Sequence, residues 1–73
     1  MQETIMNALK KKYEAEIEVA KATIAIYVDK PAGVGDHPNI VGEVDKQLEI
    51  IGCAKDKLRV IEKDYPNEDD IPF

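Results

Sequence analysis

The chain has 73 residues, of which 15 are acidic and 10 are basic, and its net charge is -5. Its single cysteine, Cys53, excludes an intrachain disulfide, and with a single histidine, His37, the chain cannot build a zinc site from a Cys/His cluster. The acidic balance argues against nucleic acid as a partner, because nonspecific binding to a phosphate backbone depends on clustered Lys and Arg.

Helical periodicity begins near the start of the chain and predicts a first helix over about 4–28. Apolar residues recur there every three or four positions, so they form one stripe along a helix. The stripe consists of Ile5, Leu9, Tyr13, Ile17, Ala20, Ile24 and Tyr27. We expect this stripe to pack against a partner helix of the same chain.

A second apolar set lies on a neighbouring face of the same helix. It consists of Ala8, Ala15, Val19, Ala22 and Ile26. Because one partner helix cannot cover both faces, this set predicts self-association into a dimer or a higher oligomer. A domain of this size also has few other means of offsetting chain entropy.

Glycine and proline mark a connection over about 29–36, and this connection is the one place where a ligand site has a physical basis. Its glycine N–H groups, the first turn of the following helix and nearby positive charge would suit a phosphate. The candidate ligand-binding residues are Lys30, Gly33, Gly35, His37 and Asn39. The alternative is that these residues only close a turn.

The second predicted helix covers about 37–64, with Asp36 or His37 as N-cap and Pro38 in the first turn. Its predicted core stripe is Ile40, Val41, Val44, Leu48, Ile51, Ala54, Leu58, Ile61 and Tyr65. Lys55 and Glu62 interrupt the heptad spacing of the first half, which favours a short antiparallel bundle over a long coiled coil.

The pattern as a whole predicts an all-α fold, an antiparallel helical hairpin over 1–65 that self-associates into a helical bundle, followed by an acidic tail at 66–73. Serine is absent, and Cys53 and His37 lie too far apart on one helix to act together, so we expect no enzyme, no metal and no cofactor. The lone thiol and the lack of a long apolar run predict a cytoplasmic protein with no membrane contact.

Three segments resemble one group of proteins: Tyr13-Glu14-Ala15-Glu16-Ile17, the connection Pro31-Ala32-Gly33-Val34-Gly35-Asp36-His37-Pro38, and Ala54-Lys55-Asp56-Lys57-Leu58. Over about residues 8–64, and mainly through the Pro-x-Gly-x-Gly-x-His-Pro connection, the chain resembles small uncharacterised helical-hairpin proteins encoded by large tailed bacteriophages. The resemblance supplies no catalytic residues.

The phage context implied by this resemblance leaves three functional hypotheses open. The first is a counter-defence protein that binds and sequesters a nucleotide signal of host immunity. The second is an adaptor or inhibitor that docks on a host or phage protein, and the third is a structural component of a larger bundle.

Overall fold

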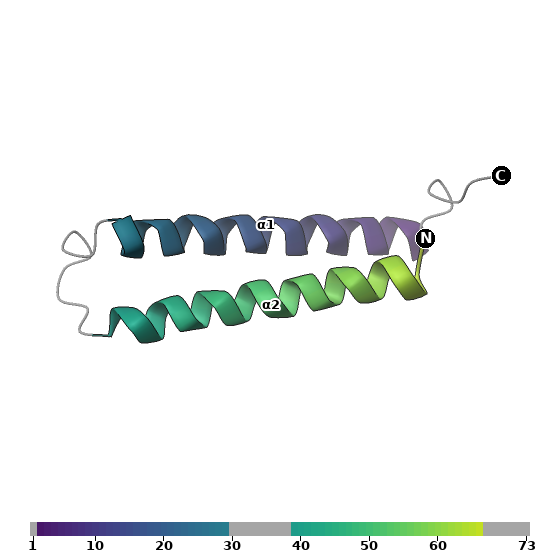
Figure 1. The fold of residues 1–73 in the computed structure, drawn as a ribbon. Coiled ribbons are helices and arrows are strands. Elements are labelled where there is room, and N and C mark those ends of the chain that lie inside the picture. Colours follow the sequence, from purple (N-terminus) through teal and green to yellow (C-terminus); the bar gives the residue numbers. More distant parts are fainter. Residues whose placement is uncertain (1, 30–38, 67–73) are drawn as a thin grey trace.

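Two antiparallel helices make up the part of the chain that the structure, a computed structural model, describes, namely residues 2–29 and 39–66. Helix α1 spans Gln2–Asp29 and helix α2 spans Ile40–Asp64, and the start of α1 and the end of α2 lie at the same end of the molecule (Figure 1). The predicted all-α helical hairpin is therefore confirmed.

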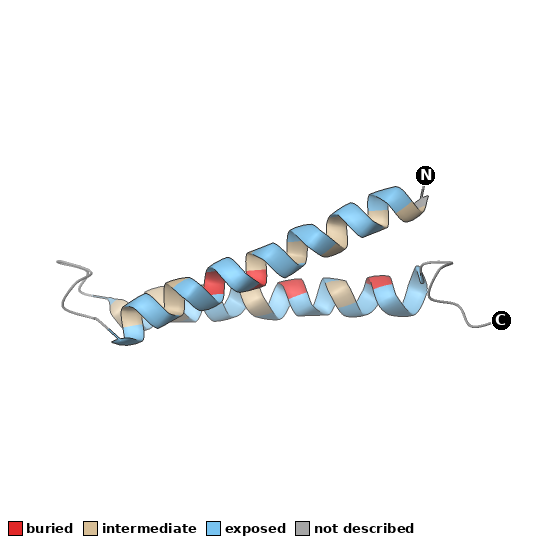
Figure 2. Ribbon diagram, turned by 90° about the horizontal axis from the view of Figure 1, so that it is seen from above, coloured by how far each residue is buried: buried red, intermediate tan, exposed pale blue. Residues whose placement is uncertain are grey.

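The hairpin is a thin rod with a small core. It measures 54 × 20 × 15 Å, and its radius of gyration is 16.3 Å, whereas a compact domain of this length would have about 11 Å. Only Ile17, Ala20, Ala54 and Ile61 are buried among the described residues. In Figure 2 the helices overlap at one end of the rod and separate toward the start of α1. One partner helix thus leaves most of each helix surface open.

The inner face of α1 follows the predicted stripe from its middle to its end. Ile17 and Ala20 are 7% and 1% exposed, and Tyr13 and Tyr27 are half-buried. The prediction is wrong at Ile5, which is 52% exposed. Its neighbour Met6 is half-buried instead, because Met6 lies seven residues before Tyr13 and so continues the inner face.

The inner face of α2 differs from the prediction by one residue in its first half. Val41, Leu48 and Tyr65 are 83%, 55% and 44% exposed, so their placement in the core is wrong. Apart from Gly42 and Glu43 in the first turn, which are also half-buried, the half-buried and buried positions follow an unbroken alternation of four and three residues: Ile40, Val44, Gln47, Ile51, Ala54, Leu58 and Ile61. The heptad spacing therefore continues through α2, and Lys55 and Glu62 lie outside it and are exposed.

The N-cap of α2 is Asn39, which corrects the prediction of Asp36 or His37. The Asn39 side-chain Oδ1 accepts a hydrogen bond of 3.0 Å from the backbone N–H of Gly42. Its backbone carbonyl accepts a second bond, of 3.1 Å, from the N–H of Glu43. Gly42 leaves room for this cap, since a Cβ atom there would lie 2.8 Å from the Asn39 Cγ. Helix α2 therefore begins at Ile40 and not at residue 37.

Gly52 faces open space, so no close contact between the described helices compensates for a glycine in this helix interior. A Cβ atom at Gly52 would have no neighbour within 4 Å. We therefore expect Gly52→Ala to raise the free energy of unfolding by about 1 kcal/mol, the propensity difference between the two residues. Thermal unfolding followed by circular dichroism should show a midpoint higher by about 4–8 °C. An unchanged or lower midpoint would show that this position contacts a second chain.

Candidate interaction face on α1

Two series of residues with seven-residue spacing run along a side of α1 that α2 leaves exposed. Alanine fills one series, and larger side chains fill the other. Together they are Ile5, Ala8, Lys12, Ala15, Val19, Ala22 and Ile26, which we call the outer seam. Their alternation of three and four residues is the spacing of the a and d positions of a coiled coil.

Every residue of the outer seam is exposed in the hairpin. The three large apolar members, Ile5, Val19 and Ile26, are 52%, 66% and 59% exposed. At 100° per residue the outer seam lies about 130° around the helix from the inner face that packs on α2. Helix α1 thus has two apolar faces, and α2 covers one of them.

A groove connects the outer seam to α2. Its open volume is about 530 Å³, and it is lined by Lys12, Ala15, Glu16, Val19, Ala20, Gln47 and Ile50. Ile50 contributes an apolar side chain from α2 that is 41% exposed. A helix laid on the outer seam would therefore meet apolar surface from both helices of the hairpin.

Charge changes sign along the outer side of α1. Lys10, Lys11 and Lys12 are consecutive, and Glu14, Glu16 and Glu18 follow within two turns. Lys12 is the one charged member of the outer seam, and its Nζ lies 5.9 Å from the centre of the Tyr13 ring. The first half of the face is thus basic and the middle is acidic.

A second groove, of about 350 Å³, lies between α1 and the end of α2. Its lining includes Tyr13 and Lys57, and the Lys57 Nζ lies 5.2 Å from the centre of the Tyr13 ring. This cation–π contact joins the two helices and stabilises them by about 0.5–1 kcal/mol at such an exposed site. Residues that line this groove therefore help to hold the two helices together.

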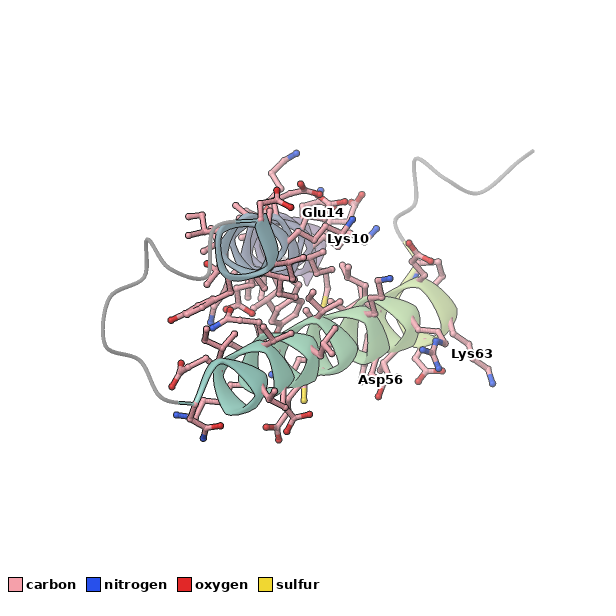
Figure 3. The ribbon with its side chains drawn as sticks, turned by 60° about the vertical axis from the view of Figure 1, so that its left-hand side comes forward. Lys10, Glu14, Asp56 and Lys63 are labelled. Carbon is pink, nitrogen blue, oxygen red and sulfur yellow. The ribbon has the colours of Figure 1, made fainter. Side chains whose placement is uncertain are left out.

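The charged side chains labelled in Figure 3 lie on the outside of the hairpin, and Lys63 extends away from α1. The ion pairs on this surface include Arg59 to Asp56 at 2.8 Å and Lys46 to Glu43 at 3.5 Å, each between residues three apart on α2. Such exposed pairs contribute little to stability. They keep the sides of α2 polar and leave the outer seam as the long apolar face.

The predicted anion site falls largely on residues outside the described part of the chain. Lys30, Gly33, Gly35 and His37 lie between the two described ranges. Asn39 is described, and its side-chain oxygen is engaged in capping α2. Nucleotide binding at the connection therefore stays a prediction from the sequence.

The other chemical candidates concern the described residues 2–29 and 39–66 only. Cys53 is a free, exposed thiol. In these two ranges no three His, Cys, Asp or Glu side chains are grouped so that they could hold a metal ion, and neither helix is long and apolar enough to cross a membrane. Among the described residues, the outer seam is thus the feature best suited to an interaction surface.

No protein family profile, curated protein or solved structure matches this chain. The resemblance to phage-encoded hairpin proteins, which depends mainly on the connection, therefore stays a prediction as well.

Proposed function

We propose that this chain is a non-enzymatic accessory protein that acts by helix–helix association, with the outer seam of α1 as its docking surface for a helix of a protein partner. The observation that carries the proposal is the second apolar face of α1. That face keeps a seven-residue repeat from Ile5 to Ile26, although all of its members are exposed in the described part of the chain. A repeat that the chain's own fold does not use is best explained by a helix from outside the chain.

The seam has the composition of a helix-docking surface. Ala8, Ala15 and Ala22 are small enough to let a second helix axis come close, while Val19 and Ile26 offer apolar area. The seam spans residues 5–26, which is about 32 Å of helix and six turns. Among the three hypotheses from the sequence, this supports the adaptor and the bundle component, which both act through protein contacts.

Site-specific photo-cross-linking tests the proposal in the cells that make the protein. A photoreactive amino acid replaces Lys11, which is exposed beside the outer seam, or Lys55, an exposed lysine on α2 outside the groove. We expect a discrete cross-linked protein with the probe at Lys11 and none with the matched probe at Lys55. Equal products from both positions, or none from Lys11, would overturn the proposal.

A further inference from the structure

We infer that the helix that occupies the outer seam is α1 of a second copy of this chain, packed antiparallel. The inference rests on the proposed function, because it names the partner of the same surface. Two observations carry it: the alternation of large and small residues along the seam, and the change of charge sign along the same face.

The seam is complementary to itself when two copies run in opposite directions. In an antiparallel pair, the a positions of one helix lie opposite the d positions of the other. All the large side chains of the seam occupy one series, and all its alanines occupy the other. Each layer of an antiparallel pair therefore combines a large residue with an alanine, which is the combination that fills space evenly.

One register follows from this rule. Placing Lys12 opposite Ala15 of the copy also brings Ile5 opposite Ala22 and Val19 opposite Ala8. Two-fold symmetry repeats each of these layers, so the interface contains six layers around an axis near Tyr13 and Glu14. Lys12 then passes over an alanine and can extend its ammonium group to solvent.

Charge favours the same orientation. In this register the basic run that includes Lys11 lies beside the copy's acidic stretch that includes Glu16 and Glu18. Lys11 and Glu18 flank the seam on the same side, so symmetry places two Lys11–Glu18 pairs across the interface. A parallel pair would instead set Lys12 against Lys12 in one layer, which costs free energy.

The groove beside the seam adds contact area to this pair. Ile50 and Gln47 of α2 line that groove together with Glu16 and Val19 of α1. A second α1 lying on the seam therefore also covers part of α2 and meets a surface built by the whole hairpin. The product is an assembly of four helices from two chains.

Disulfide trapping separates the antiparallel pair from its alternatives. The starting point is Cys53→Ser, into which Ala8→Cys and Val19→Cys are introduced in separate proteins. A disulfide needs Cα atoms within about 7 Å. In the antiparallel register, residues 8 and 19 of different copies face each other, whereas two copies of residue 8, or of residue 19, are about 16 Å apart along the helix.

The expected result is that neither variant forms a covalent dimer by itself and that an equilibrated mixture oxidises to the Ala8→Cys/Val19→Cys heterodimer, identified by intact mass. Ala25→Cys, at an exposed position outside the seam, mixed with Val19→Cys is the control and should yield no dimer. Sedimentation of the unmodified chain at micromolar concentration should give a dimer.

Two outcomes would overturn the inference. Covalent dimers from each single variant alone would indicate a parallel pair, and a monomer in sedimentation together with no trapped heterodimer would exclude self-pairing. In the second case, a cross-link from Lys11 to a different protein would still support the proposed function. The absence of that cross-link would contradict both the self-pairing and the proposed function.

Discussion

Ala20→Asp should leave the chain largely unfolded. Ala20 is 1% exposed, so the aspartate carboxylate would be enclosed between the helices, and its side chain is too short to reach water. An uncompensated buried charge costs about 3–5 kcal/mol, which equals the whole stability that a core in a domain this small supplies. Far-ultraviolet circular dichroism at 25 °C should show the loss of most of the helical signal.

Ala25→Asp is the matched control for that prediction. Ala25 lies on the same helix and is exposed, and it belongs to neither the inner face nor the outer seam. The substitution carries the same helix-propensity cost without burying a charge, so we expect a loss of less than about 1 kcal/mol. Similar losses for the two variants would mean that the inner face of α1 is not the core of the hairpin.

The hairpin was predictable from the sequence because both helices repeat apolar residues over many turns. It was harder to predict which residues of α2 face α1, because each of the first two heptads offers two adjacent candidates for the same core position. Val41 and Leu48 begin one series that continues to Lys55 and Glu62, whereas Ile40 begins the series that continues through Gln47 to Ala54 and Ile61. The polar Gln47 made the correct series look weaker at its second position. Following each series to the end of the helix would have favoured the second one, because it ends on buried apolar residues.

The start of α2 was ambiguous for a chemical reason. Asp36 and Asn39 both carry side chains that cap helices well, and His37 and Pro38 lie between them. Pro38 at the first helical position suggested the earlier cap. The deciding feature is Gly42, which has no side chain to collide with the Asn39 carboxamide. That close approach depends on three-dimensional placement, so composition alone could not show it.

The exposed apolar face of α1 was predicted in part, and self-association through it stays a prediction. All five residues assigned to self-association are exposed, in keeping with their assignment to a face other than the core. The sequence pattern places Ile5 in the core stripe and includes Lys12 in neither apolar set. The available signal was the spacing, since Ile5 and Lys12 lie fourteen and seven residues before Val19. The contribution of Ile50 from α2 appears only when the two helices are placed side by side.

Ala22→Asp should dissociate the protein without removing its helical hairpin core. Ala22 is exposed in the hairpin and lies in the outer seam, opposite Ile5 of the second copy in the antiparallel register. Self-pairing would force the new carboxylate against an apolar side chain, at a cost of about 3 kcal/mol, so the dissociation constant of the dimer should rise by roughly a hundredfold. This cost is the sum over the two symmetry-related positions that carry the substitution in each dimer. Sedimentation equilibrium over a range of concentrations measures the constant directly.

The comparison of three aspartates on one helix makes this result specific. Ala20→Asp places a carboxylate on the inner face, Ala22→Asp places one in the outer seam, and Ala25→Asp places one in neither. Dissociation by Ala22→Asp should also lower the thermal midpoint and remove its dependence on protein concentration, because a dimer gains stability by mass action and a monomer does not. An Ala22→Asp variant with the sedimentation profile of Ala25→Asp would show that the outer seam holds no second copy, and the photo-cross-link at Lys11 would then decide whether another protein's helix occupies it.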